Sequence, residues 1–164
     1  MFPFLVAIGA LSVLVWDLMR PSPPPRPLWI QALRTLPFAI VSVLSIVTAG
    51  RAPNGRHPFQ VDWSLAAEDL ARSMTKVPHL QSIAILFLLA VIALGVRRLG
   101  AAFAITMSIG VAWEIAEATV VGHHARLSDL APDLVAALLA IGFVAGLRRV
   151  LTRRPADAER EKTS

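Results

Sequence analysis

Residues 79–98 read HLQSIAILFLLAVIALGVRR, and no Asp, Glu, Lys or Arg precedes the closing arginine pair. An α-helix needs about 20 mainly apolar residues to cross the ~30 Å hydrocarbon core of a bilayer. In lipid a helix also satisfies its backbone hydrogen bonds within the segment. We therefore predict a transmembrane helix over about 79–96, with Arg97 and Arg98 at its cytoplasmic end.

Further apolar stretches lie on both sides of this run. They cover about residues 2–19, 29–49, 99–121 and 130–147. Each approaches the length of a membrane span. The predicted fold class is therefore all-α, a polytopic bundle of about five transmembrane helices. Residues 1–154 are expected to form this single transmembrane domain, and residues 155–164 a short, disordered, charged tail.

The composition supports a membrane protein over a soluble one. Of the 164 residues 55% are hydrophobic and the mean hydropathy is +0.63, whereas a soluble domain is usually about 45–50% apolar. The formal charge of +5 sits mainly at segment ends and in the tail, where it favours a topology signal over nucleic-acid binding. The chain has no cysteine, which excludes disulfides, thiol chemistry and cysteine-ligated metals.

The basic residues also predict an orientation. With the amino terminus outside, eleven Lys and Arg residues fall on the inner side and five on the outer side. The positive-inside rule then favours amino terminus out and carboxyl terminus in. Arginine far outnumbers lysine, as in GC-rich bacterial genomes. The predicted localisation is a bacterial inner (cytoplasmic) membrane, which the chain crosses several times. Arg34, early in the second stretch, is expected to reach the interface by snorkelling.

The longest connection, residues 50–77, is expected on the outer side. It opens with the turn residues Pro53, Asn54 and Gly55. Ser64 is a suitable N-cap for a short helix that follows it. We expect that helix to lie flat at the interface, with Trp63 as its anchor.

Ionisable residues gather at the predicted outer ends of the last three spans. Six of them form three pairs spaced three or four residues apart, so that each pair shares one helical face, and Arg126 lies in the loop between the last two spans. Carboxylates inside a membrane are costly unless they are paired, and they are functional candidates by default. The candidate site residues are Lys76, His79, Glu114, Glu117, Arg126, Asp129 and Asp133.

The same residues carry a resemblance to a known family. Lys76-Val77-Pro78-His79 resembles the Lys-x-x-His motif of the VanZ-like membrane proteins. The segment from Glu114 to Glu117 is similar to that family's Glu-x-x-Gln, and the segment from Arg126 to Asp129 to its Arg-x-x-Asp. The similarity spans about residues 72–147. Glu117 stands where the family has Gln, and Asp133 where Asn is common, as in a diverged member.

This resemblance implies a role in the cell envelope, because the family is associated with resistance to glycopeptides such as teicoplanin. We predict that the outer polar cluster binds a lipid headgroup or an envelope precursor. In this prediction the basic side chains bind the phosphate and the carboxylates orient the basic side chains. Three alternatives stay open: an accessory subunit of a larger membrane complex, a metal- or carboxylate-dependent membrane enzyme, and a proton-coupled carrier. No cofactor is predicted. The expected partners are membrane lipid and, for an accessory subunit, other membrane protein subunits.

Overall fold

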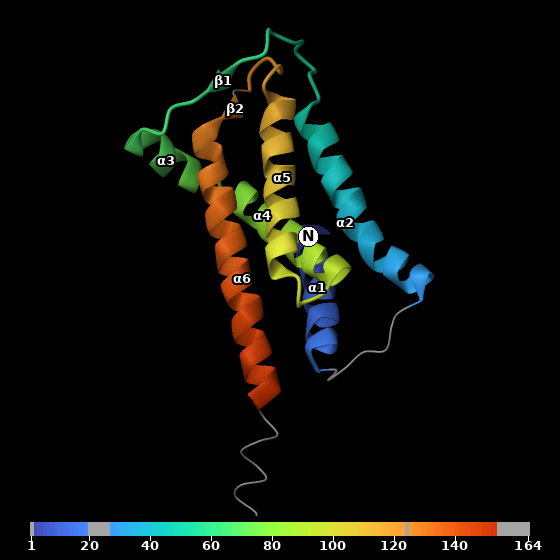
Figure 1. Cartoon of the computed structure of the whole chain (residues 1–164). Helices are drawn as coiled ribbons and strands as arrows, with labels where there is room; N and C mark the ends of the chain where they lie inside the picture. Colours follow the sequence, from blue (N-terminus) through green and yellow to red (C-terminus); the bar gives the residue numbers. More distant parts are fainter. Residues whose placement is uncertain (1, 20–26, 124, 154–164) are drawn as a thin grey trace, which may run out of the picture.

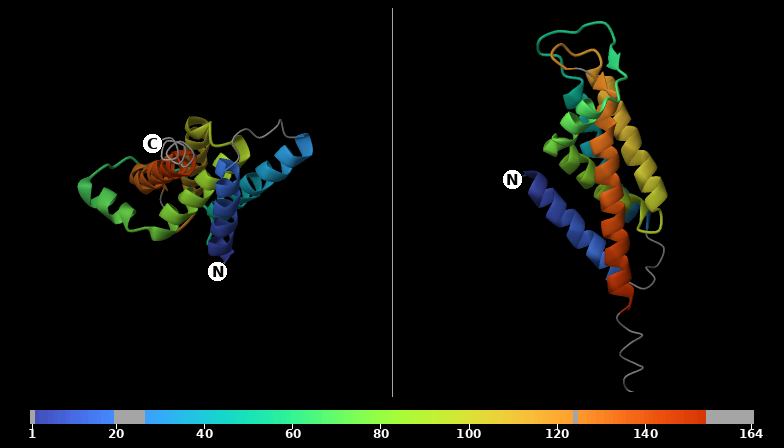
Figure 2. Two further views of the ribbon diagram at one scale, coloured as in Figure 1. Left: turned by 90° about the horizontal axis from the view of Figure 1, so that it is seen from below. Right: turned by 90° about the vertical axis from the view of Figure 1, so that its left-hand side faces the viewer.

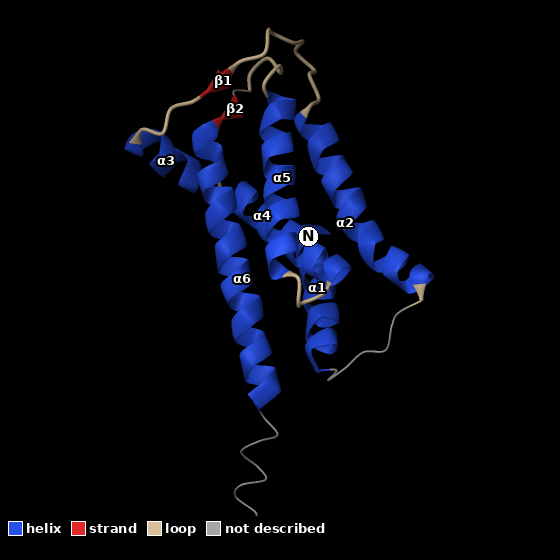
Figure 3. Cartoon of the chain, in the orientation of Figure 1, coloured by secondary structure: helices blue, strands red, loops and turns tan. Residues whose placement is uncertain are grey.

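The computed structural model describes residues 2–19, 27–123 and 125–153. This part of the chain contains six α-helices and one 3₁₀ helix (Figure 1). The α-helices are α1 (Phe2–Met19), α2 (Leu28–Ala49), α3 (Ala67–Met74), α4 (Val77–Leu94), α5 (Leu99–Glu117) and α6 (Leu130–Arg153), and η1 is Leu127–Asp129. Two strands of two residues each, β1 (Val61–Asp62) and β2 (Ala125–Arg126), complete the structure (Figure 3).

Helix α4, the stretch of highest hydropathy among the candidate spans, is the centre of the bundle. It packs against α1, α2, α5 and α6, and it lies behind α5 and α6 in Figure 1. Leu86, Phe87 and Val91 on α4 are completely buried. Helix α4 contains no Asp, Glu, Lys or Arg, so other helices can surround it without burying an ionised side chain.

Four helical segments in the described part of the chain are long and apolar enough to cross a membrane. They are Leu28–Ala49, Val77–Leu94, Leu99–Glu117 and Leu127–Leu151. Large apolar side chains remain exposed along them, including Leu36, Ile40, Val43 and Leu139. Such a surface is expected where a helix faces lipid instead of water. The predicted all-α bundle with several helices long and apolar enough to span a membrane is thus confirmed at this level.

The first predicted span matches α1 in length but not in orientation. Helix α1 begins part way along the bundle and runs obliquely across it, toward the end where α2 begins (Figure 2). It contributes the buried residues Ala10, Leu14 and Leu18 to the core. A fifth crossing by α1 therefore stays a prediction.

Two helix boundaries differ from those predicted by more than two residues. Helix α5 ends at Glu117 and not near residue 121, because the residues that follow bond to the preceding loop. His57 N donates to Thr119 O, and Val121 N donates to Gly55 O, at 3.0 and 3.2 Å. Helix α6 continues to Arg153, beyond the predicted end at 147.

Residues 50–66 form a strap across the end of the bundle where α5 ends and α6 begins (Figure 1). In the strap β1 pairs with β2 in parallel, with Val61 opposite Ala125. The strap then leads into α3, which packs against η1 and α6. Helix α3 confirms the short helix expected here, but its N-cap is Ala66 and not Ser64.

Arg34 does not snorkel to the interface. Its guanidinium forms a two-pronged ion pair with Asp17 of α1, and its Nε donates to the carbonyl oxygen of Ile92 at 3.1 Å. The side chains of Arg34 and Asp17 are only 14% and 9% exposed. The pair was missed because Asp17 lies on another helix. The tail predicted at 155–164 lies outside the described residues.

Candidate functional site

All seven predicted site residues lie at the end of the bundle covered by the strap. Lys76 and His79 come from the start of α4, and Glu114 and Glu117 come from the end of α5. Arg126 lies in β2, Asp129 in η1 and Asp133 in the first turn of α6. The seven side chains do not all contact one another. Instead they divide into separate contacts at different depths.

Asp129 is the hub of the outermost contact. Its side chain is 2% exposed, and its Oδ2 accepts from Lys76 Nζ at 2.6 Å. Its Oδ1 accepts from the hydroxyl of Ser73 at 2.6 Å, and Ser73 Oγ lies 3.2 Å from Ser128 Oγ. These bonds tie α3 to η1. Both oxygens of a buried carboxylate are thereby satisfied, as burial of a charge demands.

Asp133 lies one turn further along α6 and is bound far less completely. Its side chain is 3% exposed, and its Oδ1 makes no hydrogen bond. The nearest base is His79, whose Nδ1 lies 3.7 Å from that oxygen. The other oxygen, Oδ2, packs against Gly110 of α5, where a Cβ would lie only 2.6 Å from it. A side chain at position 110 would therefore collide with the carboxylate.

His79 is held from its other side by Trp113 of α5. The two rings are 5.2 Å apart between centroids and tilted by 32°, a separation within the range of favourable ring contacts. Trp113 Nε1 donates to Glu117 Oε1 at 2.7 Å. Glu117 Oε2 lies 3.5 Å from His123 Nδ1. His124 lies outside the described residues.

Glu114 forms a hydrogen bond with the backbone of β2. Its Oε2 accepts from the backbone N–H of Arg126 at 3.1 Å, and the residue is 7% exposed. The Arg126 side chain turns to the strap, where its Nε lies 3.9 Å from Asp62 Oδ2. That separation is an ion-pair distance and not a hydrogen bond. The buried Nε of Arg126 has no hydrogen-bond partner.

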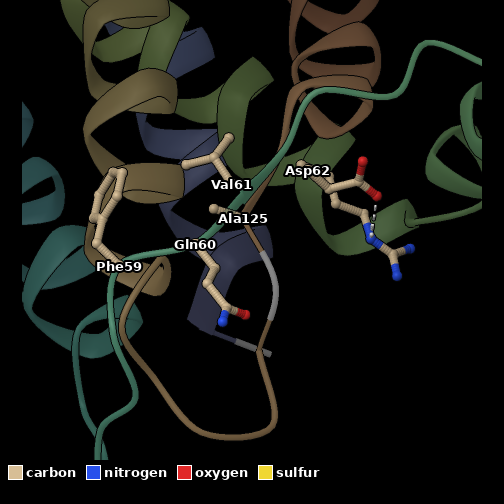
Figure 4. Close-up of a pocket in the computed structure, with 6 residues that line it drawn as sticks. Phe59, Gln60, Val61, Asp62 and Ala125 are labelled. Atoms are coloured by element: carbon tan, nitrogen blue, oxygen red, sulfur yellow. Dashed lines mark ion pairs between the residues drawn. The ribbon is translucent and has the colours of Figure 1, made fainter.

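Arg126 and Asp62 also line an open hollow of about 600 Å³ beneath the strap. Its other lining residues are Phe59, Gln60, Val61 and Ala125. Figure 4 shows Phe59 and Asp62 at opposite ends of this set, with the Arg126 ion pair beside Asp62. The hollow is open to the surface, and the side chain of Arg126 beside it is 27% exposed.

Sequence reasoning missed several partners of the site. Asp62 and Ser73 lie in the polar connection before α4, where nothing in the local pattern marks them. Trp113 could have been found, since it precedes Glu117 by four residues on the same helical face. Gly110 is likewise one turn before Glu114. Its importance depends on Asp133, which reaches it from another helix.

Among the residues that the structure describes, no group of three or more His, Cys, Asp or Glu side chains is placed to hold a metal ion. Three of the four predicted carboxylates instead accept hydrogen bonds from protein groups: Asp129 from Lys76 and Ser73, Glu117 from the Trp113 indole, and Glu114 from the Arg126 backbone. Comparison of the chain with protein-family models, with curated proteins and with solved structures finds no match.

Proposed function

We propose that this chain is a VanZ-like membrane protein of the bacterial cell envelope that binds a phosphate-bearing lipid headgroup at its outer face. Lys76 and Arg126 are the proposed phosphate ligands. The headgroup belongs to a membrane lipid or to a lipid-linked envelope precursor, and both sources present the same anionic phosphate. No bond needs to be made or broken for this role.

One observation carries the proposal: each of these two bases lies beside a carboxylate and yet stays partly accessible. Lys76 is held by Asp129 and its side chain is 37% exposed. Arg126 lies beside Asp62 and its side chain is 27% exposed. A lysine keeps two further N–H donors after bonding one carboxylate oxygen, and a guanidinium has five in all.

The geometry suits an anion because Lys76 is already held in place by its hydrogen bond to Asp129. A carboxylate that fixes a long side chain reduces the conformational entropy lost when the anion binds. The bond from Glu114 to the Arg126 backbone adds to this, since it fixes β2 relative to α5. Charge-assisted hydrogen bonds to phosphate are about twice as strong as neutral ones.

The orientation of the chain forms part of the proposal. We place the strap and the polar cluster outside and Arg97, Arg98 and the carboxyl terminus inside, with α1 as a fifth span and the amino terminus outside. The excess of basic residues on the opposite side supports this orientation. The exposed side chain of Trp63, 72% accessible in the strap, suits the interface.

Native mass spectrometry of the protein released mildly from its own membrane tests the proposal. We expect adducts of phospholipid or lipid-linked precursor mass on the wild type. When defined lipids with matched acyl chains are added, phosphatidylglycerol should bind better than phosphatidylcholine. Arg126→Gln and Lys76→Gln should each weaken binding of the anionic lipid by about tenfold, the loss expected for one hydrogen bond to a charged group.

Arg51→Gln is the matched control. Arg51 is exposed at the same end of the bundle, so its removal changes the net charge equally without touching the hollow. Equal losses in all three variants would reduce the effect to general electrostatics and contradict the proposal. A bare protein found only inside a larger complex would favour the alternative, an accessory subunit.

A further inference from the structure

The buried pair of His79 and Asp133 is not used by the headgroup site. It lies inside the bundle, between α4, α5 and α6, and not in the hollow beneath the strap. Gly110, which contacts Asp133, is seven residues before the end of α5. At about 1.5 Å per residue the carboxylate therefore sits on the order of 10 Å inside that helix end. An ionisable group at such a depth is costly unless it has a partner.

The Asp133 carboxylate lacks that partner on one oxygen. Its Oδ1 is buried and accepts no hydrogen bond, although an unsatisfied buried acceptor costs about 1–3 kcal/mol and more when charged. Gly110 blocks the other oxygen from moving away, because the helix backbone stands directly against it. The position of Oδ1 is therefore fixed, and a hydrogen-bond donor is required to satisfy it.

His79 is the base best placed to supply this donor. Besides His79, the charged groups near Asp133 on the elements around the start of α6 are Glu68, Asp69, Arg72, Lys76, Glu114, Glu117, Arg126 and Asp129, whereas Asp17 of α1 lies at the opposite end of the bundle. Lys76 is bonded to Asp129, Arg126 lies beside Asp62, and Arg72 is exposed on α3. His79 Nδ1 is 3.7 Å from Asp133 Oδ1, and a shift of under 1 Å would close a hydrogen bond.

We propose that His79 and Asp133 form an exchangeable proton-binding site, with one proton shared between Nδ1 of the imidazole and Oδ1 of the carboxylate. The side chain of His79 is 17% exposed and starts in the first turn of α4, so the proton is exchanged with the outer surface. Trp113 limits the rotation of the ring. This site is independent of the headgroup site, and it makes the bundle responsive to protons from the outside.

Infrared difference spectroscopy of the full chain in liposomes tests the proposal. The sample is titrated from about pH 8 to about pH 5, the range in which histidine changes its charge. We expect a carboxylate stretch to change in the wild type when the neighbouring imidazole takes up the proton. That component should be absent in Asp133→Asn, and its midpoint should shift in His79→Gln. Glu68→Gln, which changes an exposed acid of α3, should leave it in place.

Two results would overturn the proposal. The first is a spectrum of Asp133→Asn identical to that of the wild type. The second is a carboxylate component whose midpoint is the same with and without His79, which makes the two groups uncoupled neighbours. Because His79→Gln keeps the carboxylate against Gly110, it remains informative if Asp133→Asn fails to fold. Addition of NaCl at fixed pH should leave the component unchanged, and its loss would assign the site to sodium instead.

Discussion

The bundle contains two groups of buried charges, at opposite ends of α4, and they are built in opposite ways. Near the carboxyl end of α4, Asp17 and Arg34 form a closed pair with two parallel contacts, and Arg34 also bonds the Ile92 carbonyl. At the end of the bundle that the strap covers, Asp133 and Arg126 each keep a buried atom without a hydrogen bond. A satisfied pair holds helices together, whereas unsatisfied atoms in a polar site are where a ligand or a proton can be accepted.

The largest expected effect comes from breaking the closed pair. Asp17→Ala leaves Arg34 buried and unpaired, which should lower the free energy of unfolding by about 3–5 kcal/mol. Removing both charges with Asp17→Ala and Arg34→Met should recover most of that loss, because no charge then remains uncompensated. Unfolding in bicelles measures both variants. A double variant as unstable as the single one would show that the pair does more than hold α1 to α2.

A smaller effect is expected where Asp133 meets Gly110. In Gly110→Ala the new Cβ would lie 2.6 Å from Asp133 Oδ2, so the helices must separate or the carboxylate must move, at about 1–3 kcal/mol. Gly100→Ala in the same helix has no atom within 4 Å of its Cβ and should be neutral or slightly stabilising. The thermal midpoint of both variants in detergent measures the difference.

A second variant decides whether the collision is the cause. Combining Gly110→Ala with Asp133→Ala removes the colliding oxygen, so the cost of the new methyl group should largely disappear. If the double variant loses as much stability as the sum of its single changes, the two positions do not interact and the contact does not position the carboxylate.

The smallest effect concerns Thr106, one turn before Gly110 on the buried face of α5. Its hydroxyl is fully buried and has no hydrogen-bond partner. Thr106→Val replaces that hydroxyl with a methyl group of similar size and should raise the free energy of unfolding by up to about 1 kcal/mol. Thr35→Val, at an exposed position of α2 where the hydroxyl bonds Gln31 O at 2.8 Å, is the comparison. A destabilised Thr106→Val would show that the hydroxyl is in use.

Much of the helical architecture follows from hydropathy, because a backbone in lipid must satisfy its hydrogen bonds within the segment. The predicted span 29–49 differs from α2 by one residue, and 79–96 differs from α4 by two at each end. The end of α5 could not be predicted, since residues 118–121 are as apolar as the helix before them. Their backbone groups form hydrogen bonds with the strap. The end of α5 therefore depends on a segment more than fifty residues earlier in the chain.

The sequence by itself determined the helical class, the long apolar segments and the gathering of charged residues at one end, since these depend on composition and on spacing within a helix. Only the tertiary structure decided which charges are satisfied. Lys76 turns to Asp129, Arg34 turns to Asp17, and Asp133 is left against Gly110 with one oxygen free. These pairings join different elements, and a hydrogen bond depends on distances of a few tenths of an ångström that no local pattern contains.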